Sequence, residues 1–177
     1  MRKLLNFVDT YLLGALAHRF SCAMRKYRCW RNSNIVHNEG GRISGECEVG
    51  YPENIHIGKN SYMNGGVLQA SPNAKIMIGE DCLISYNVHI RTDVHNYLEK
   101  DTLIREQGHS EADICIGNDV WIGYGAQVMS GVKIADGCVI GAGAIVTHDT
   151  VPYGVYVGVP ARLIKMRCKP QIDIERE

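Results

Sequence analysis

The residues best suited to chemistry lie in the segment Thr92–His95, directly before a long polar stretch. Asp93 precedes His95 by two residues, so their side chains share a face if this segment is an extended strand. A neutral imidazole at an outward position can remove a proton from a hydroxyl or an amine. Asp93 is expected either to orient the ring of His95 or to be a solvated carboxylate. A single histidine on a surface strand more often has no catalytic role, so the residues alone leave both interpretations open.

Two further histidines lie near His95 in the sequence. His89 follows Val88, which the repeat described next places inward, so His89 is expected at the surface or at a subunit contact. His109 lies in the polar stretch, and a solvated loop histidine is the expectation there, with contact to the site around His95 as the alternative.

A six-residue repeat over residues 116–150 must position these side chains. Neither a helix nor a simple alternating strand has this period, and a fixed repeat indicates units that stack on their copies to bury their apolar sides. Two inward side chains per unit suit short strands joined by corners, three of which close a coil of about eighteen residues. The first residue of each unit, called its opener, is a large aliphatic residue: Ile116, Ile122, Val128, Ile134, Ile140 and Val146. The smaller residues four positions later are Val120, Ala126, Val132, Cys138, Ala144 and Thr150.

The repeat extends backwards, less regularly, to about residue 43. Residues 69–75 are polar and are predicted to loop out of a coil. Residues 96–113 interrupt the six-residue repeat, which continues in register on either side of them. A polar loop of this length inside a compact repeat is usually functional or disordered. The inward pairs predicted before this loop include Ile57/Ser61, Met63/Val67, Ile78/Cys82, Ile84/Val88 and Ile90/Val94.

Residues 1–31 lack the repeat and show helical periodicity instead. The segment carries seven Lys or Arg residues against the single acid Asp9. It has no uncharged stretch long enough to span a bilayer, and Asn6 and Asp9 interrupt the apolar run that a signal peptide would need. Two roles stay open: a cap packed on the first coil, or a helix that docks at a membrane interface. The apolar positions are Leu4, Leu5, Val8, Leu12, Leu16, Phe20, Met24 and Tyr27.

Composition favours one domain in a reducing compartment. The chain has 177 residues and a formal net charge of zero, so the whole chain gives no signal for nucleic-acid binding. Its seven cysteines form no CxxC pair, and Cys47, Cys82 and Cys138 fall on small inward positions, which favours core packing over a disulfide framework. The predicted segments are a helical segment 1–32, a repeat domain 33–168 with an extruded loop 96–113, and a polar tail 169–177.

The repeat and the closing segment Gly141–Lys165, which reads GAGAIVTHDTVPYGVYVGVPARLIK, resemble the hexapeptide-repeat acyltransferases. Residues 53–64 and 76–97 look like the galactoside and maltose O-acetyltransferase branch, and Thr92–His95 is similar to the Asp-x-His segment of polysaccharide O-acetyltransferases. The resemblance implies an all-β fold, a left-handed parallel β-helix with an N-terminal helix. It also implies a homotrimer with sites at subunit interfaces, acetyl-CoA as the acyl donor, and His95 as the catalytic base.

The same resemblance assigns the remaining site residues. The small residues have a second explanation, because the corners of the coil require them, and the two basic residues at the end of the repeat have a solvated basic tail as the alternative. Asn64 matches an acceptor-contacting asparagine, and Trp121 is expected to point outward and contact the acceptor. Tyr124 stands where the sugar-acetylating branch has a serine, so only its backbone N–H remains to polarise a thioester oxygen. The sugar-binding aspartate of that branch is absent from residues 70–73, which argues against a simple galactoside enzyme. The implied cofactor-binding residues are Gly123, Tyr124, Ala126, Ala142, Gly143, Ala144, Thr147, His148, Pro160, Arg162 and Lys165.

The resulting hypothesis is acetyl-CoA-dependent O-acetylation of a sugar hydroxyl. The basic helix 1–31 suits a membrane-linked glycan, which favours cell-surface polysaccharide synthesis at a cytoplasmic location, with peripheral contact at the inner membrane face as an option. N-acetylation of an amino sugar nucleotide and a non-catalytic β-helix scaffold are alternatives. A γ-type carbonic anhydrase shares the fold but needs three histidines that converge on zinc. His89 and His95 are one repeat apart on different faces, so no metal is expected.

Overall fold

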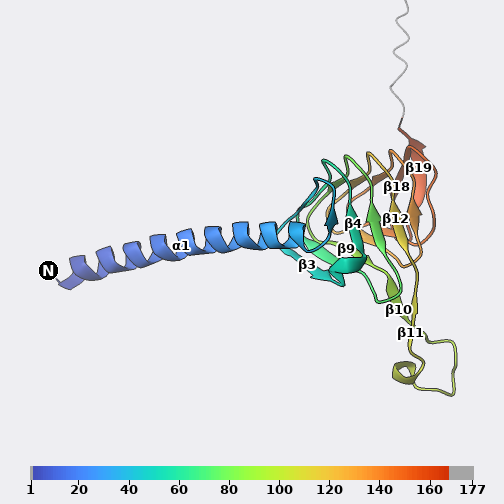
Figure 1. The fold of residues 1–177 in the computed structure, drawn as a ribbon, viewed down its shortest axis with the longest axis horizontal. Helices are drawn as coiled ribbons and strands as arrows, with labels where there is room; N and C mark the ends of the chain where they lie inside the picture. Colours follow the sequence, from blue (N-terminus) through green and yellow to red (C-terminus); the bar gives the residue numbers. More distant parts are fainter. Residues whose placement is uncertain (1, 168–177) are drawn as a thin grey trace, which may run out of the picture.

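The computed structural model describes residues 2–167, and it describes side chains from residue 13 onward. A single long helix, α1 (Arg2–Asn34), precedes a solenoid of short strands (Figure 1). The predicted polar tail 169–177 lies outside the described residues. The side chains of Leu4, Leu5, Val8 and Leu12 also lie outside them.

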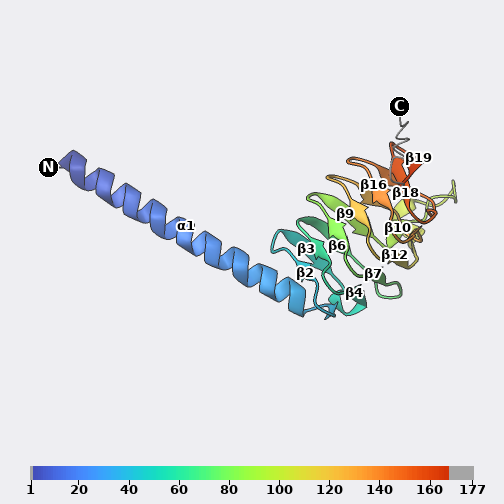
Figure 2. The same ribbon diagram turned by 90° about the horizontal axis from the view of Figure 1, so that it is seen from above.

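The strands wind into five coils, and each coil contributes one strand to each of three parallel sheets (Figure 2). The first sheet contains β1 (His37–Asn38), β4 (Ile55–Ile57), β7 (Ile76–Ile78), β12 (Ile114–Ile116) and β15 (Lys133–Ile134). The second contains β2 (Arg42–Ile43), β5 (Tyr62–Met63), β8 (Leu83–Ile84), β13 (Trp121–Ile122), β16 (Val139–Ile140), β18 (Gly154–Val157) and the antiparallel β19 (Arg162–Met166). The third contains β3 (Cys47–Gly50), β6 (Gly66–Gln69), β9 (Val88–Arg91), β14 (Gln127–Val128) and β17 (Ile145–Val146). The expected left-handed parallel β-helix is confirmed.

The predicted inward positions of residues 116–150 form the core of the later coils. Every opener from Ile116 to Val146 is buried, and so is every smaller partner from Val120 to Ala144. Burying an aliphatic side chain of this size contributes about 1.5–3 kcal/mol. Cys47 and Cys82 are also buried, and burial raises the pKa of the Cys47 thiol to about 12 and raises that of Cys82. These thiols therefore stay protonated and act as core packing groups.

Two inward positions predicted in the earlier coils are wrong. Leu68, and not Val67, is buried, because Gly66 occupies the corner beside Val88 and a Cβ at Gly66 would collide with the Val88 carbonyl. Val94 is 41% exposed. The chain leaves the third sheet after Arg91, so the buried polar residue Thr92 fills the corner position of this coil.

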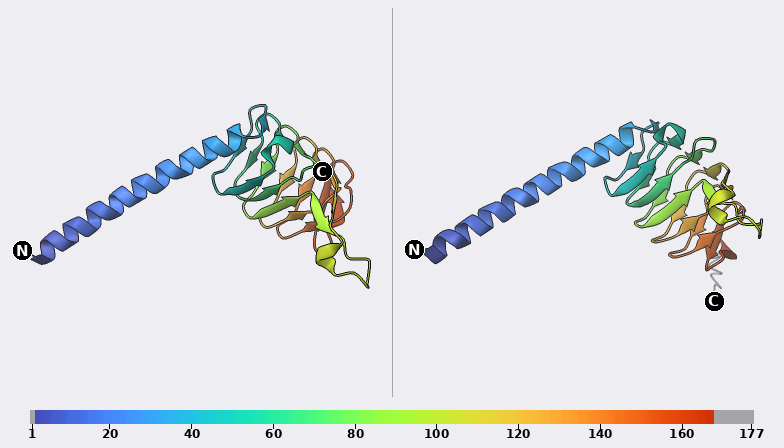
Figure 3. Two further views of the ribbon diagram at one scale, coloured as in Figure 1. Left: turned by 60° about the horizontal axis from the view of Figure 1, so that its bottom comes forward. Right: turned by 90° about the horizontal axis from the view of Figure 1, so that it is seen from below.

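In the part of the helix whose side chains the structure describes, contact with the solenoid is made through the last turns (Figures 1 and 3). Asn32 is buried there, and its Nδ2 donates hydrogen bonds to the carbonyls of Ser44 (2.9 Å) and Cys47 (3.0 Å). Gly45 lets the two segments approach, since a Cβ on it would lie 2.8 Å from the Arg25 carbonyl oxygen. The cap expected from the sequence is therefore limited to the helix end. No helix in the described residues is both long and apolar enough to cross a membrane.

Candidate functional site

A β-hairpin leaves the solenoid between β9 and β12 and carries His95 with it. Its strands are β10 (Asp93–His95) and β11 (His109–Glu111), and the 3-10 helix η2 (Ile104–Glu106) lies in the loop between them. The strands pair antiparallel, so that Asp93 lies opposite Glu111 and His95 opposite His109. Figure 1 shows the hairpin projecting away from the coils. The interruption of the repeat therefore builds an ordered arm outside the β-helix.

Thr92 fixes the base of this hairpin. It is fully buried, and its carbonyl oxygen accepts hydrogen bonds from Ser130 Oγ (2.6 Å) and the Ala112 N–H (3.0 Å). Its own N–H donates to the Gln69 carbonyl (3.1 Å), and its hydroxyl lies 2.7 Å from the buried Ser71 hydroxyl. Because Thr92 bonds to the coils before and after it, it determines where the chain exits and hence where His95 lies.

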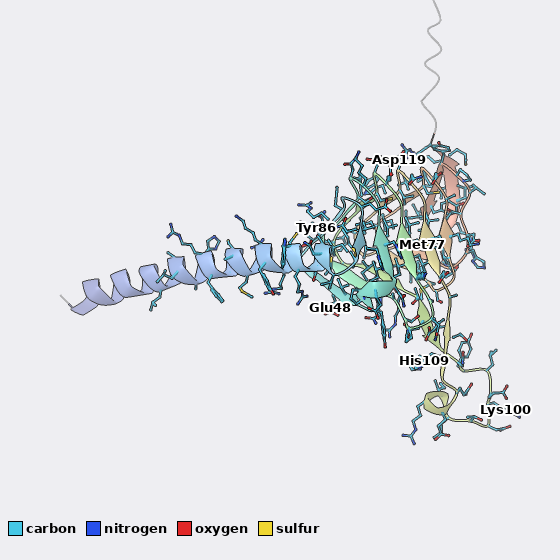
Figure 4. The ribbon with its side chains drawn as sticks, in the orientation of Figure 1. Glu48, Met77, Tyr86, Lys100, His109 and Asp119 are labelled. Atoms are coloured by element: carbon cyan, nitrogen blue, oxygen red, sulfur yellow. The ribbon has the colours of Figure 1, made fainter. Side chains whose placement is uncertain are left out.

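His95 and His109 form a pair of rings on one face of the hairpin. Their ring centroids are 4.1 Å apart, and the ring planes are inclined at 40°. Figure 4 shows His109 on the hairpin, outside the solenoid. His109 is exposed, as expected of a solvated histidine, but it lies in strand β11, where the strand register also places its ring against that of His95. The separation of these two residues in the sequence contains no signal for this pairing.

A pocket of about 540 Å³ opens beside His95 and is large enough for a small molecule. Its walls combine hydrogen-bonding groups, such as Asn96 and Gln107, with apolar groups, such as Tyr97 and Leu98. The other residues that line it are Val94, Glu99, Thr102 and Ser110. His95 thus borders a cavity whose walls combine polar and apolar groups.

Asp93 bonds to Arg91 and not to His95. Arg91 Nε lies 2.6 Å from Asp93 Oδ1, and Nη2 lies 3.3 Å from Oδ2. This hydrogen bond is the main reason that the pKa of Asp93 lies below its usual value, and burial partly opposes it. No hydrogen bond joins Asp93 to His95 in the part of the chain that the structure describes. The predicted orienting role therefore has no support in the hydrogen bonds, and Asp93 instead holds Arg91 at the hairpin base.

Six of the predicted cofactor residues, Gly123, Tyr124, Ala126 and Ala142–Ala144, gather at another corner, between the second and third sheets. Tyr124 is hydrogen-bonded to the coils on either side of its own. Its carbonyl oxygen accepts a hydrogen bond from the Gly143 N–H (2.8 Å), and its hydroxyl oxygen accepts one from Asn87 Nδ2 (2.6 Å). Tyr124, Ala142 and Gly143 are exposed, and a Cβ on Gly143 would meet open space. A ligand can therefore approach the backbone at this corner.

Some of the predicted small residues serve the coil itself. A Cβ on Gly123 would lie 2.7 Å from the Ala142 nitrogen, so stacking of adjacent coils requires glycine there. Ala126 and Ala144 are fully buried, and their side chains fill the core. Their side chains therefore serve core packing, the second explanation that the sequence offered for the small residues, and a ligand contact there is left to the backbone.

The remaining predicted residues lie elsewhere on the coils, and all of them are exposed except Asn64, which is half-buried. Thr147 Oγ1 lies 2.8 Å from His148 Nδ1 just after β17. Pro160, Arg162 and Lys165 are exposed around the β18–β19 hairpin. Trp121 is 53% exposed, as expected. Asn64 lines a pocket of about 280 Å³ together with Arg25, Lys26, Arg42 and Tyr86, at the end of α1.

One chain does not bring the predicted base and the predicted cofactor corner together. Tyr124 and Gly143 precede the strands of the third sheet, whereas the hairpin with His95 follows that sheet. Tyr86, at the Tyr124 corner, and His109, on the hairpin, accordingly lie well apart in Figure 4. A site that uses both regions therefore needs a second copy of the chain.

Replacing Thr92 with valine is expected to loosen the hairpin base. The variant leaves the buried Ser71 hydroxyl without its partner, which costs about 1–3 kcal/mol. Thr92→Ser keeps the hydroxyl and is the matched control. Urea denaturation of both variants measures the effect, and equal midpoints for valine and serine would show that this hydrogen bond does not fix the hairpin.

The repeats resemble those of a known family of proteins. Residues 116–148 match the family model described as bacterial transferase hexapeptide (six repeats). The predicted resemblance to hexapeptide-repeat acyltransferases is thereby confirmed.

Several named relatives share this fold. Galactoside O-acetyltransferase of Escherichia coli (strain K12) is 40% identical over 116 residues, which are 65% of this chain and 55% of that protein. A structure of galactoside acetyltransferase in complex with coenzyme A has a TM-score of 0.61 and 39% identity, over 68% of this chain and 58% of that one. A maltose O-acetyltransferase from Clostridium difficile 630 has a TM-score of 0.64 and 27% identity, over 82% and 87% of the two chains. The chain spans about half the length, or less, of the first curated relatives that it matches.

Proposed function

We propose that this protein is an O-acetyltransferase that moves an acetyl group from acetyl-CoA to a sugar hydroxyl, with His95 as the general base. The observation that carries the proposal is the position of His95, exposed on an extruded hairpin at the edge of a 540 Å³ pocket. Relatives named as galactoside and maltose O-acetyltransferases support both the reaction and the class of acceptor.

The residues present suit a thioester donor at the Tyr124 corner. Acetyl-CoA would supply an activated acetyl group, and the open backbone at Gly143 would allow its narrow arm to lie close to the coil. The Tyr124 N–H would donate to the carbonyl oxygen on which negative charge develops. Arg162 and Lys165 are exposed cations that suit phosphate groups.

His95 handles the proton in the proposed reaction. Its neutral imidazole accepts the proton of the acceptor hydroxyl while that oxygen forms a bond to the acetyl carbonyl carbon. The same proton then passes from the imidazolium to the departing thiolate sulfur as the carbon–sulfur bond breaks. His95 thus returns to its neutral form without a metal ion or another proton donor.

The active assembly in this proposal is a homotrimer with a site at each interface. The hairpin exposes Tyr97, Leu98 and Ile104, while the outer face of the second sheet exposes Leu83 and Trp121. These are two different apolar surfaces, which suits a head-to-tail contact that closes into a ring. The hairpin of one copy would then bring His95 to the Tyr124 corner of the next copy, and Trp121 would border the acceptor.

The acceptor class follows from the pocket and from α1. The side chains of Asn96, Gln107 and Ser110 make one wall of the pocket polar and are held by hydrogen bonds within the hairpin, and Tyr97 supplies an aromatic face for a sugar ring. A basic helix in the same chain suits acceptors held at a membrane, so we assign the reaction to cell-surface polysaccharide synthesis on the cytoplasmic side. The second pocket with Asn64 lies at the end of α1 and is a candidate for a further acceptor contact.

An acceptor screen tests the proposal. The purified protein is incubated with acetyl-CoA and a panel of mono- and oligosaccharides, and the released thiol is followed with a chromogenic reagent. We expect thiol release that depends on a hydroxylated sugar, with an equal amount of an O-acetyl ester detected by mass spectrometry. Turnover only with amino sugars would replace O- by N-acetylation, and failure to bind acetyl-CoA would favour a scaffold role.

A further inference from the structure

Helix α1 exposes a continuous apolar stripe along most of its described side chains. Leu13, Leu16 and Phe20 are 66%, 61% and 69% exposed, and Tyr27 and Trp30 continue the stripe towards the solenoid. These residues are separated by three, four, seven and three positions, so they share one face of the helix. Figures 2 and 3 show that this part of α1 projects away from the coils. Neither the β-helix nor the proposed reaction accounts for this surface.

The other faces of the same helix are basic. Arg19, Arg25 and Lys26 are exposed and lie away from the centre of the stripe. No Asp or Glu occurs between residues 10 and 38. The ion pairs found among the described side chains include none from α1. The helix therefore presents uncompensated positive charge together with exposed apolar area.

The charge decides which partner fits the stripe. Parallel helices that pair through such a stripe usually place acidic residues opposite basic ones at the flanking positions. Two copies of α1 would bring like charges together and have no acidic residue nearby to compensate them. A nucleic acid would match the cations but would leave Leu16, Phe20 and Trp30 in water. An anionic lipid surface satisfies both features, because the acyl boundary takes up the stripe and phosphate groups attract the cations.

We propose that α1 docks reversibly along an anionic membrane surface through the stripe that includes Leu13, Leu16, Phe20, Tyr27 and Trp30. Tyr27 and Trp30 lie side by side, with ring centroids 6.0 Å apart, and aromatic side chains of this kind are enriched at the membrane interface. Docking holds the β-helix next to the lipid surface. The proposal goes beyond the acetyltransferase reaction and does not depend on it.

Vesicle co-sedimentation with the full chain tests this proposal. The probes are vesicles of phosphatidylcholine alone and vesicles that also contain phosphatidylglycerol. We expect the protein to sediment with the anionic vesicles at about 0.05 M salt and to be released at about 0.5 M salt, because the attraction of the cations is screened. Deletion of residues 1–22 removes most of the described stripe, keeps the helix end that contacts the solenoid, and should abolish sedimentation.

A pair of matched variants separates the stripe from the rest of the helix. Leu16→Gln with Phe20→Gln should lower the partition coefficient about 10-fold or more, because both side chains would lose their burial in lipid. His18→Gln with Ser21→Gln places the same two residues on the polar face and should change it by less than about twofold. Both double variants should retain wild-type turnover on soluble sugar acceptors, which separates this test from that of the reaction.

Three outcomes would overturn the proposal. The intact chain could stay in the supernatant with anionic vesicles at low salt, or the two double variants could partition equally. Light scattering without vesicles could also show that Leu16→Gln with Phe20→Gln lowers the oligomer mass, which would assign the stripe to contacts between copies of the chain.

Discussion

Replacing His95 with alanine should lower turnover by about 10²-fold or more and leave the fold intact. His95 is exposed on the hairpin, so its removal creates no cavity in the core. In the proposed reaction His95 removes the acceptor proton and holds no part of CoA, so the affinity for CoA should stay near the wild-type value. Thiol release measures turnover, calorimetry measures CoA binding, and thermal unfolding reports the fold.

The controls for this variant come from the neighbours of His95. His109→Ala removes the adjacent ring, and Asp93→Asn weakens the bond to Arg91 while keeping nearly the same shape. Both should lower turnover less than His95→Ala, because neither group removes the acceptor proton in the proposed reaction. Near-normal turnover of His95→Ala would contradict the assignment, and a greater loss in His109→Ala would identify His109 as the base.

Mixing two inactive variants should restore activity if each site is shared between two copies. His95→Ala lacks the base, and Ala142→Trp places a large side chain over the exposed corner near Tyr124. In randomly mixed trimers about a quarter of the interfaces would combine an intact hairpin with an intact corner. Denaturing and refolding the two variants together should therefore recover about a quarter of the wild-type turnover.

This result depends on the number of chains in the assembly and on exchange between variants. Light scattering should give three times the 19.7 kDa of one chain for the wild type and for both variants. Each variant refolded alone should remain inactive. A refolded mixture that stays inactive, or a fully active monomer, would place the complete site within one chain.

The hexapeptide pattern determined the coil because the packing it encodes is local. Each opener between Ile116 and Val146 needs only the next corner to turn it inward, and all of them are buried. The same locality explains why the prediction was wrong at Val67 and Val94. One coil has Gly66 at its corner, and another gives way to the hairpin at Thr92, so the count of six no longer identifies the inward residue.

The structure alone decided which side chains meet at the candidate site. One face of the strand carries every second residue, which places Arg91, Asp93 and His95 side by side. The sequence cannot tell which of its two neighbours the carboxylate of Asp93 will bond. The pairing of His95 with His109 depends on the register of a hairpin whose loop has no short turn signal. The sequence likewise showed that residues 1–31 have an apolar face, but only the coordinates showed that Leu13, Leu16 and Phe20 remain exposed. The six-residue repeat depends only on residues that are close in the sequence. The contacts of Asp93 and His95, and the exposure of the helix stripe, depend instead on strand register and on how the helix is placed relative to the coils.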